Sequence, residues 1–93
     1  MAVINLNIIK SGVMWETQPL CCSGGDVRIR VHKNGPYPVN VMVSIDGNEE
    51  YLHHDDFGFD EPKCEVTLEG TMPGQFVKFT SRCELQLVKC IIL

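Results

Sequence analysis

Short runs in which apolar and polar residues alternate are the feature that most constrains this chain. The clearest runs are 27–32, 39–45 and 63–69, each with an apolar side chain at nearly every second position. Successive side chains of a strand point to opposite faces of its sheet, so each run has one apolar and one polar face. Several such runs at short spacing predict an antiparallel all-β domain.

The length and charge of the chain limit what this domain can do. Its 93 residues suit a single domain, 1–93, with a thin core. The formal net charge of −4 argues against nucleic-acid binding, which needs a basic stripe. One small basic group, Arg28, Arg30, His32 and Lys33, is interpreted as a solvated strand face. No apolar stretch is long enough to span a bilayer.

We predict an antiparallel β-sandwich of about seven or eight strands. The expected strands are 2–9, 13–20, 26–32, 39–45, 49–53, 63–69, 75–80 and 83–93. Asp46-Gly47 predicts a tight hairpin turn, and Pro73-Gly74 suits the middle of a type II turn. Asp55–Pro62 is expected to be an acidic loop.

The last strand changes phase. Leu85 and Leu87 point one way, whereas Val88, Cys90 and Ile92 carry the apolar pattern on the other parity. A β-bulge near Val88-Lys89 would keep both sets buried. Alternatively, both faces of this strand are covered, the second by a partner subunit.

The cysteines favour a reducing compartment. There are five, an odd number that suits a disulfide scaffold badly, and the N-terminal residues do not resemble a signal peptide. Cys64 and Cys83 occupy inward strand positions, and the sequence leaves a bridge between them open. The last four residues fit a prenylation pattern as a string, but they continue a strand and are interpreted as its buried end.

An acidic segment with two histidines is the candidate metal site. Carboxylates and imidazoles are common metal ligands, and the candidates are His53, His54, Asp55, Asp56 and Asp60. Adjacent histidines on a strand face opposite sides, and the spacing matches no known metal loop. The simpler interpretation is a solvated acidic loop that keeps an exposed strand from pairing. We therefore expect no metal and no cofactor.

Catalysis is not expected either. No local signature surrounds a nucleophile, and no helix N-terminus is available to lower a thiol pKa. The vicinal Cys21-Cys22 pair lacks the two-residue spacing of redox and zinc sites. A thin sandwich also has little room for an enclosed substrate pocket.

The chain carries more large apolar side chains than one thin core can hold. The surplus lies in loops or at outward positions: Tyr37, Met42, Tyr51, Phe57, Phe59, Met72 and Ile91. Exposed aromatic and methionine side chains mark protein–protein contacts, so these residues form the predicted interface. The alternative is that they cap the open ends of the sandwich.

The runs 27–31 and 39–45, the Asp46-Gly47 turn and the segment 73–77 resemble an immunoglobulin-like β-sandwich module over the last two-thirds of the chain. Small modules of this kind look like accessory proteins of phage and virus particles. The resemblance implies a non-enzymatic virion component (head decoration, connector or tail protein) that binds protein subunits, forms a homo-oligomer and contacts neither nucleic acid nor membrane. It would reside in the virion, or in the cytoplasm of the producing cell before assembly.

Two alternatives remain open. One is a metal-binding regulatory domain that uses the His53–Glu61 loop, and the other is an acidic inhibitor of a host enzyme.

Overall fold

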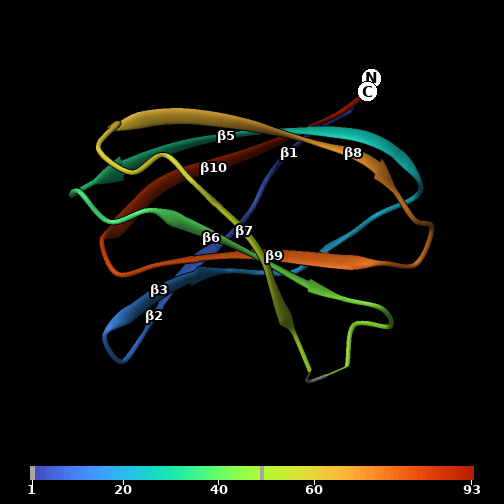
Figure 1. The fold of residues 1–93 in the computed structure, drawn as a ribbon, viewed down its shortest axis with the longest axis horizontal. Helices are drawn as coiled ribbons and strands as arrows, with labels where there is room; N and C mark the ends of the chain where they lie inside the picture. The colour runs from blue at the N-terminus through green and yellow to red at the C-terminus, as the bar shows by residue number, and fades with distance from the viewer. Residues whose placement is uncertain (1, 49) are drawn as a thin grey trace.

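Residues 2–48 and 50–93 are described by a computed structural model, in which they form ten strands and no helix (Figure 1). The strands make two antiparallel sheets, so the predicted all-β antiparallel sandwich is confirmed. Sheet A has the order β1 (Ala2–Asn5), β10 (Glu84–Ile92), β5 (Gly25–Asn34) and β8 (Lys63–Thr71). Sheet B has the order β2 (Ile8–Ser11), β3 (Met14–Thr17), β9 (Phe76–Ser81), β6 (Val39–Ser44) and β7 (Leu52–Phe57), and β4 (Leu20–Cys21) also pairs with β9.

Nothing in the described residues forms a helix long and apolar enough to cross a membrane.

The core lies where the apolar faces of the two sheets meet. On β5, Val27, Ile29 and Val31 are buried and alternate with more exposed Arg28 and Arg30, as a period of two requires. Burial of one such aliphatic side chain contributes about 1.5–3 kcal/mol. The facing residues of sheet B that are completely buried are Val39, Val41, Val77 and Phe79.

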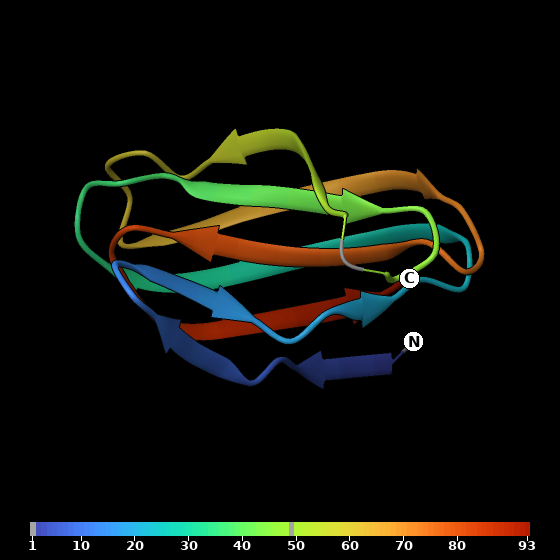
Figure 2. The ribbon, with the colours of Figure 1, turned by 90° about the horizontal axis from the view of Figure 1, so that it is seen from below.

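The first predicted strand, 2–9, is in fact two strands that belong to different sheets. Ile4, Leu6 and Ile8 all face the core, as expected. The chain crosses between the sheets at Leu6 and Asn7: the Leu6 amide donates to Val88 O in sheet A (2.9 Å), and Asn7 O accepts from the Gln18 amide beside β3 (2.9 Å). This crossing closes one long margin of the sandwich, which Figure 2 shows in dark blue.

The second predicted strand, 13–20, is also divided. It becomes β3 and β4, and Gln18-Pro19 separates them. Proline has no amide hydrogen to give to a ladder, which explains the interruption. Trp15, on β3, is half-buried and packs against the core.

A bulge does reset the last strand, but two residues before the predicted Val88-Lys89. The pairing of β10 with β5 shifts between Leu85 and Leu87. Gln86 is therefore the extra residue, and Leu85, Val88 and Cys90 are all buried. Covering of the second face by a partner is not needed to explain this pattern.

The prediction that Lys33 belongs to a solvated basic face is wrong. It occupies an inward position of β5 and is only 1% exposed. Its Nζ donates to Gly35 O (2.9 Å) and to Phe59 O (3.1 Å), which lie in two different loops. A buried ammonium is tolerated only with such partners, so Lys33 ties the β5–β6 and β7–β8 connections together.

Of two predicted connections, one is confirmed and the other is not. The Pro73-Gly74 turn is confirmed: Gly74 has φ +82°, and the Gln75 amide donates to Met72 O (3.1 Å). The strand after Asp46-Gly47 is β7, not 49–53, and Glu49 lies outside the described residues. Because β7 runs to Phe57, the first residues of the predicted 55–62 loop belong to a strand.

Gly58, in the connection between β7 and β8, shows how tightly this connection packs against β8. A Cβ there would lie 2.3 Å from Cys64 Sγ, and Gly58 has φ +70°. We expect Gly58→Ala to lower the free energy of unfolding by about 2–5 kcal/mol, combining left-handed strain and overpacking. Urea unfolding followed by circular dichroism measures it.

Gly70→Ala is the matched control, because Gly70 has φ +63° and open space around it. Its expected loss is about 1–2 kcal/mol, from backbone strain alone. Equal losses in the two variants would contradict the packing described at Gly58.

Candidate functional site

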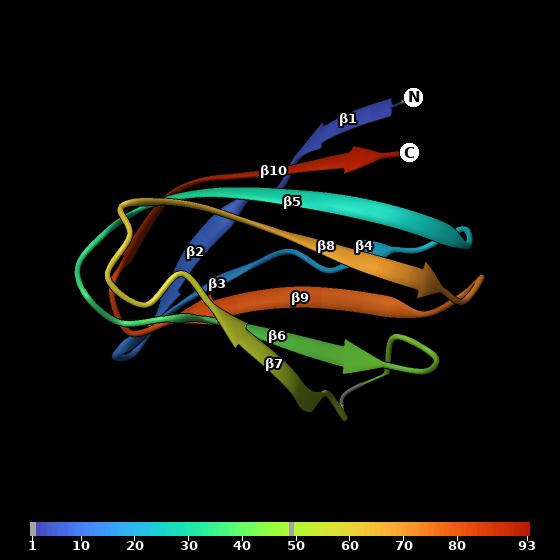
Figure 3. The same cartoon turned by 45° about the horizontal axis from the view of Figure 1, so that its top comes forward.

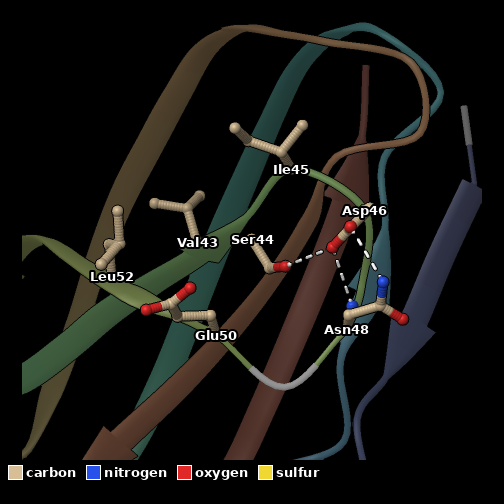
Figure 4. Close-up of a pocket in the computed structure, with 7 residues that line it drawn as sticks. All are labelled: Val43, Ser44, Ile45, Asp46, Asn48, Glu50 and Leu52. Carbon is tan, nitrogen blue, oxygen red and sulfur yellow. Dashed lines mark hydrogen bonds between the residues drawn. The ribbon is translucent and has the colours of Figure 1, made fainter.

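A wide depression of the surface lies beside the loop that joins β6 to β7. We call it the loop hollow; it measures about 720 Å³ and is lined by Val43, Ser44, Ile45, Asp46, Asn48, Glu50 and Leu52. Figure 4 shows the aliphatic side chains on one side of it and the Asp46–Asn48 pair on the other. An apolar wall with a few polar groups is the usual composition of a binding surface.

Asp46 organises this loop. Its carboxylate accepts hydrogen bonds from the Asn48 amide (3.0 Å) and from Asn48 Nδ2 (2.9 Å). The Gly47 amide donates to Ser44 Oγ (3.1 Å), which ends β6. The predicted tight hairpin turn at Asp46-Gly47 is therefore wrong, because β6 already ends at Ser44 and β7 begins only at Leu52. The hydrogen bonds from Asn48 hold the pKa of Asp46 below its ordinary value.

Ile45 leaves the sheet at this point. The alternation of 39–45 placed it inward, but it is 92% exposed because β6 ends at Ser44. Two other aliphatic side chains near it are also open to solvent, Leu52 at 66% and Met72 at 69%. A depression of about 220 Å³ is lined by all three, together with Val43, Ser44, Pro73 and Gln75. We call Ile45, Leu52 and Met72 the rim patch.

A second depression continues from the rim patch between the two sheets. This edge groove, about 300 Å³, lies between the edge strands β7 and β8. Its floor includes Val43, Val66 and Leu68, which are half-buried and pack against the core. The residues that line it are Val43, His54, Asp55, Val66, Thr67, Leu68, Glu69, Gly70, Thr71, Met72, Gln75 and Val77.

Carboxylates surround this continuous apolar surface. Asp46 and Glu50 line the loop hollow, and Asp55 and Glu69 line the edge groove. None of the described residues that line the three depressions is a lysine or an arginine. The surface therefore combines apolar contact with a negative rim.

The structure separates the predicted metal ligands. A bulge at His54 in β7 brings His53 and Asp56 together on one face, with 2.8 Å between Nε2 and Oδ1. Asn40 Nδ2 also donates to Asp56 Oδ1 (2.7 Å), and these two bonds keep the pKa of Asp56 below its ordinary value. Asp55 lies in the edge groove and Asp60 is exposed in the following loop. Among the residues described, no three histidines, cysteines or acids converge as a metal site would require.

The predicted interface residues are dispersed. Met72 lies in the rim patch, whereas Tyr37 and Phe59 are exposed in other loops. Phe57 and Ile91 are buried. The remaining two, Met42 and Tyr51, are half-buried.

Lys78 Nζ lies 4.5 Å from the centre of the Tyr51 ring, and the buried Tyr51 hydroxyl has no hydrogen-bond partner among the residues that the structure describes. Burial raises the pKa of that hydroxyl.

Sequence reasoning missed Ile45 and Leu52 as surface residues. Their signal was present: both flank a loop rich in Asp, Gly and Asn, where a strand has to end.

All five cysteines are free, and four of them are buried. Burial raises the pKa of Cys90 to about 12 and also raises the pKa of Cys22. Burial raises that of Cys64 as well, although the ammonium of Lys33 opposes this. Such thiols stay protonated at neutral pH and are poor nucleophiles.

Comparison of the chain with protein-family models, with curated proteins and with solved structures finds no match in any of the three. The candidate site therefore rests on its own geometry.

Acid should loosen the β6–β7 loop. Because the pKa of Asp46 is lowered in the folded protein, the stability it contributes is present above the unfolded pKa and is lost as pH falls through the folded one. We expect the amide signals of Gly47 and Asn48 to shift in an NMR pH titration with a midpoint below the ordinary 3.8.

The Asp46→Asn variant should show no such transition. A midpoint at or above 3.8 in the wild-type protein would contradict the hydrogen bonding described for this loop.

Proposed function

We propose that this protein is a non-enzymatic assembly module that binds other protein subunits through the rim patch. The observation that carries the proposal is the clustering of three highly exposed aliphatic residues, Ile45, Leu52 and Met72, around one depression. Exposed apolar residues scattered singly are ordinary, whereas a contiguous group bordered by polar residues is typical of a protein contact.

The energetics suit a docking surface. Covering one large aliphatic side chain is worth about 1.5–3 kcal/mol, so the rim patch supplies several kcal/mol to a partner that fits it. Such central apolar contacts, surrounded by polar residues, dominate typical interfaces.

The strand order supports the narrower proposal of a virion component. In immunoglobulin domains the last two strands are neighbours in one sheet. Here β9 lies in sheet B and β10 lies in sheet A between β1 and β5, so the resemblance extends to the two-layer shape and not to the strand order. The observed order is closer to that of a double-sheet jelly roll, an architecture that viral capsid proteins share with lectins and cupins.

Fold analogy of this kind guides the proposal but does not define it. In this proposal the module sits in the virion, and in the cytoplasm of the producing cell before assembly.

The acidic-inhibitor alternative is less favoured by the geometry. A mimic of nucleic acid needs a face made of closely spaced carboxylates, but Asp46 and Asp55 border an apolar surface, and Asp56 hydrogen-bonds with Asn40 and His53. The metal-binding alternative retains only the His53–Asp56 pair as a preformed contact.

Affinity capture from a lysate of the producing cell tests the proposal. We expect the double variant Ile45→Asp, Leu52→Asp to retain the bound partner at least about tenfold less than the wild-type protein, because two charges enter the apolar contact. Sedimentation of the pure protein shows separately whether that partner is a second copy.

Val13→Asp is the matched control, since Val13 is an equally exposed aliphatic residue in the turn between β2 and β3. It should retain the partner as the wild-type protein does. Partners that bind all three proteins equally would overturn the proposal for the rim patch.

A further inference from the structure

We infer that the edge groove receives an extended segment of a different protein, with aliphatic side chains at alternate positions and lysine or arginine between them. The inference rests on the proposed assembly function and specifies the chemistry of the partner. It follows from three properties of β8, the strand that forms one wall of the groove.

The first property is a free strand edge. In the described part of the chain β8 pairs only with β5, and β7, on the opposite wall, pairs only with β6. Figure 3 shows both strands at the margin of their sheets. An edge strand presents unpaired backbone N–H and C=O groups, to which an extended peptide can add as a further strand.

The second property is the pattern of side chains along that edge. Val66 and Leu68 point toward the core and form the groove floor, where they are half-buried. Glu65, Thr67 and Glu69 alternate with them and are exposed, and of these Thr67 and Glu69 also line the groove. A strand added beside β8 would place alternate side chains in register with each set. Aliphatic residues would continue the core beyond Val66 and Leu68. The intervening residues would lie beside Glu69, because Glu65 already pairs with Arg30, with 2.7 Å between Oε1 and Nε.

The third property is charge. Glu69 and Asp55 both line the groove, and Asp46 and Glu50 continue the negative rim into the loop hollow. The described residues that line these depressions include no lysine or arginine to neutralise them. Basic residues in the added segment would therefore be favoured over acidic ones, and they would also raise the rate of association.

A second copy of this chain is not the occupant that fits. The described segment with aliphatic and basic residues in alternation is β5, Val27 to Lys33, and it is paired on both sides, with β10 and with β8. It cannot be donated without unfolding its own sandwich. The complementary segment therefore belongs to another protein.

The length of β8 that lines the groove sets the length of the segment that can bind there. Six consecutive β8 residues, 66–71, line the groove. At about 3.3 Å per residue this wall is about 20 Å long, which suits a peptide of about six residues.

NMR titration with synthetic peptides tests the inference. The probes are a capped peptide of about seven residues that alternates lysine and valine, its counterpart with glutamate for lysine, and a peptide of the same composition as the first with its valines contiguous. We expect the basic alternating peptide to shift the signals of Val66, Leu68 and Val43, and binding to weaken as salt is raised. The glutamate and contiguous peptides should bind at least about fivefold more weakly.

Two charge reversals of equal size locate the site. Glu69→Lys should weaken the basic peptide about fivefold, and Glu84→Lys, exposed at the start of β10, should leave its affinity unchanged. Three results would overturn the inference. They are signal shifts centred on another surface, equal affinity for the basic and glutamate peptides, and no binding at about millimolar peptide. Shifts of the groove signals on concentrating the protein alone would overturn it in favour of a second copy.

This result is separable from that for the rim patch. If capture of a partner depends on Ile45 and Leu52 but the peptides do not bind the groove, the alternating basic segment inferred here is wrong and the proposed assembly function stands. If the peptides bind the groove but no captured partner depends on the rim patch, the groove is a peptide site and the proposed function fails.

Discussion

The two sheets are joined along one long margin, where β1 leads into β2, and are left apart along the other, where β7 and β8 lie. At one margin the chain passes from sheet A to sheet B through Leu6 and Asn7, with one hydrogen bond to each side and the Leu6 side chain in the core. At the other margin β7 and β8 end their sheets with few contacts between them. The core is sealed on the first side and reaches the surface on the second, at Val43, Val66 and Leu68. The candidate site is a consequence of that opening.

The end of the sandwich that carries the β5–β6 and β7–β8 connections is tightly packed. Lys33 is buried and its ammonium bonds to carbonyl groups of two loops, which fixes the position of both. Gly58 packs against Cys64 so closely that no side chain fits between them. By contrast, two of the three rim-patch residues, Ile45 and Met72, lie in loops, and Leu52 is the first residue of β7. A scaffold of two packed sheets therefore presents apolar loop residues at one end, as the proposed docking on larger partners requires.

Periodicity predicted the layers because every second residue of β5 and β9 is buried in the core. It failed where a local contact ends or shifts the alternation. Pro19 divided one predicted strand, the extra residue Gln86 reset another, and Ser44 ended β6 before Ile45. Lys33 was assigned by its charge to the surface, whereas its position in the alternation pointed inward.

The candidate site was harder to predict than the fold. It depends on which two strands lie at the open margin, and strand order is set by long-range pairing that no local pattern encodes. Met72 was foreseen as an exposed apolar residue, but its proximity to Leu52 follows only from the placing of two loops side by side. The metal hypothesis failed for the reverse reason. The candidate ligands are close in sequence, but the pleat of β7 and the bulge at His54 direct their side chains to different places.

Hydrogen exchange of the backbone amides tests the open margin most directly. We predict that the amides of 27–32 in β5 and of 89–92 in β10, which lie in strands paired on both sides, are protected, together with that of Leu6 at the closed margin. Alternate amides of β7 and β8 should exchange at rates near those of an unfolded chain. Uniform protection along β7 and β8 in the isolated protein would show that this margin is closed in solution, and would contradict the account.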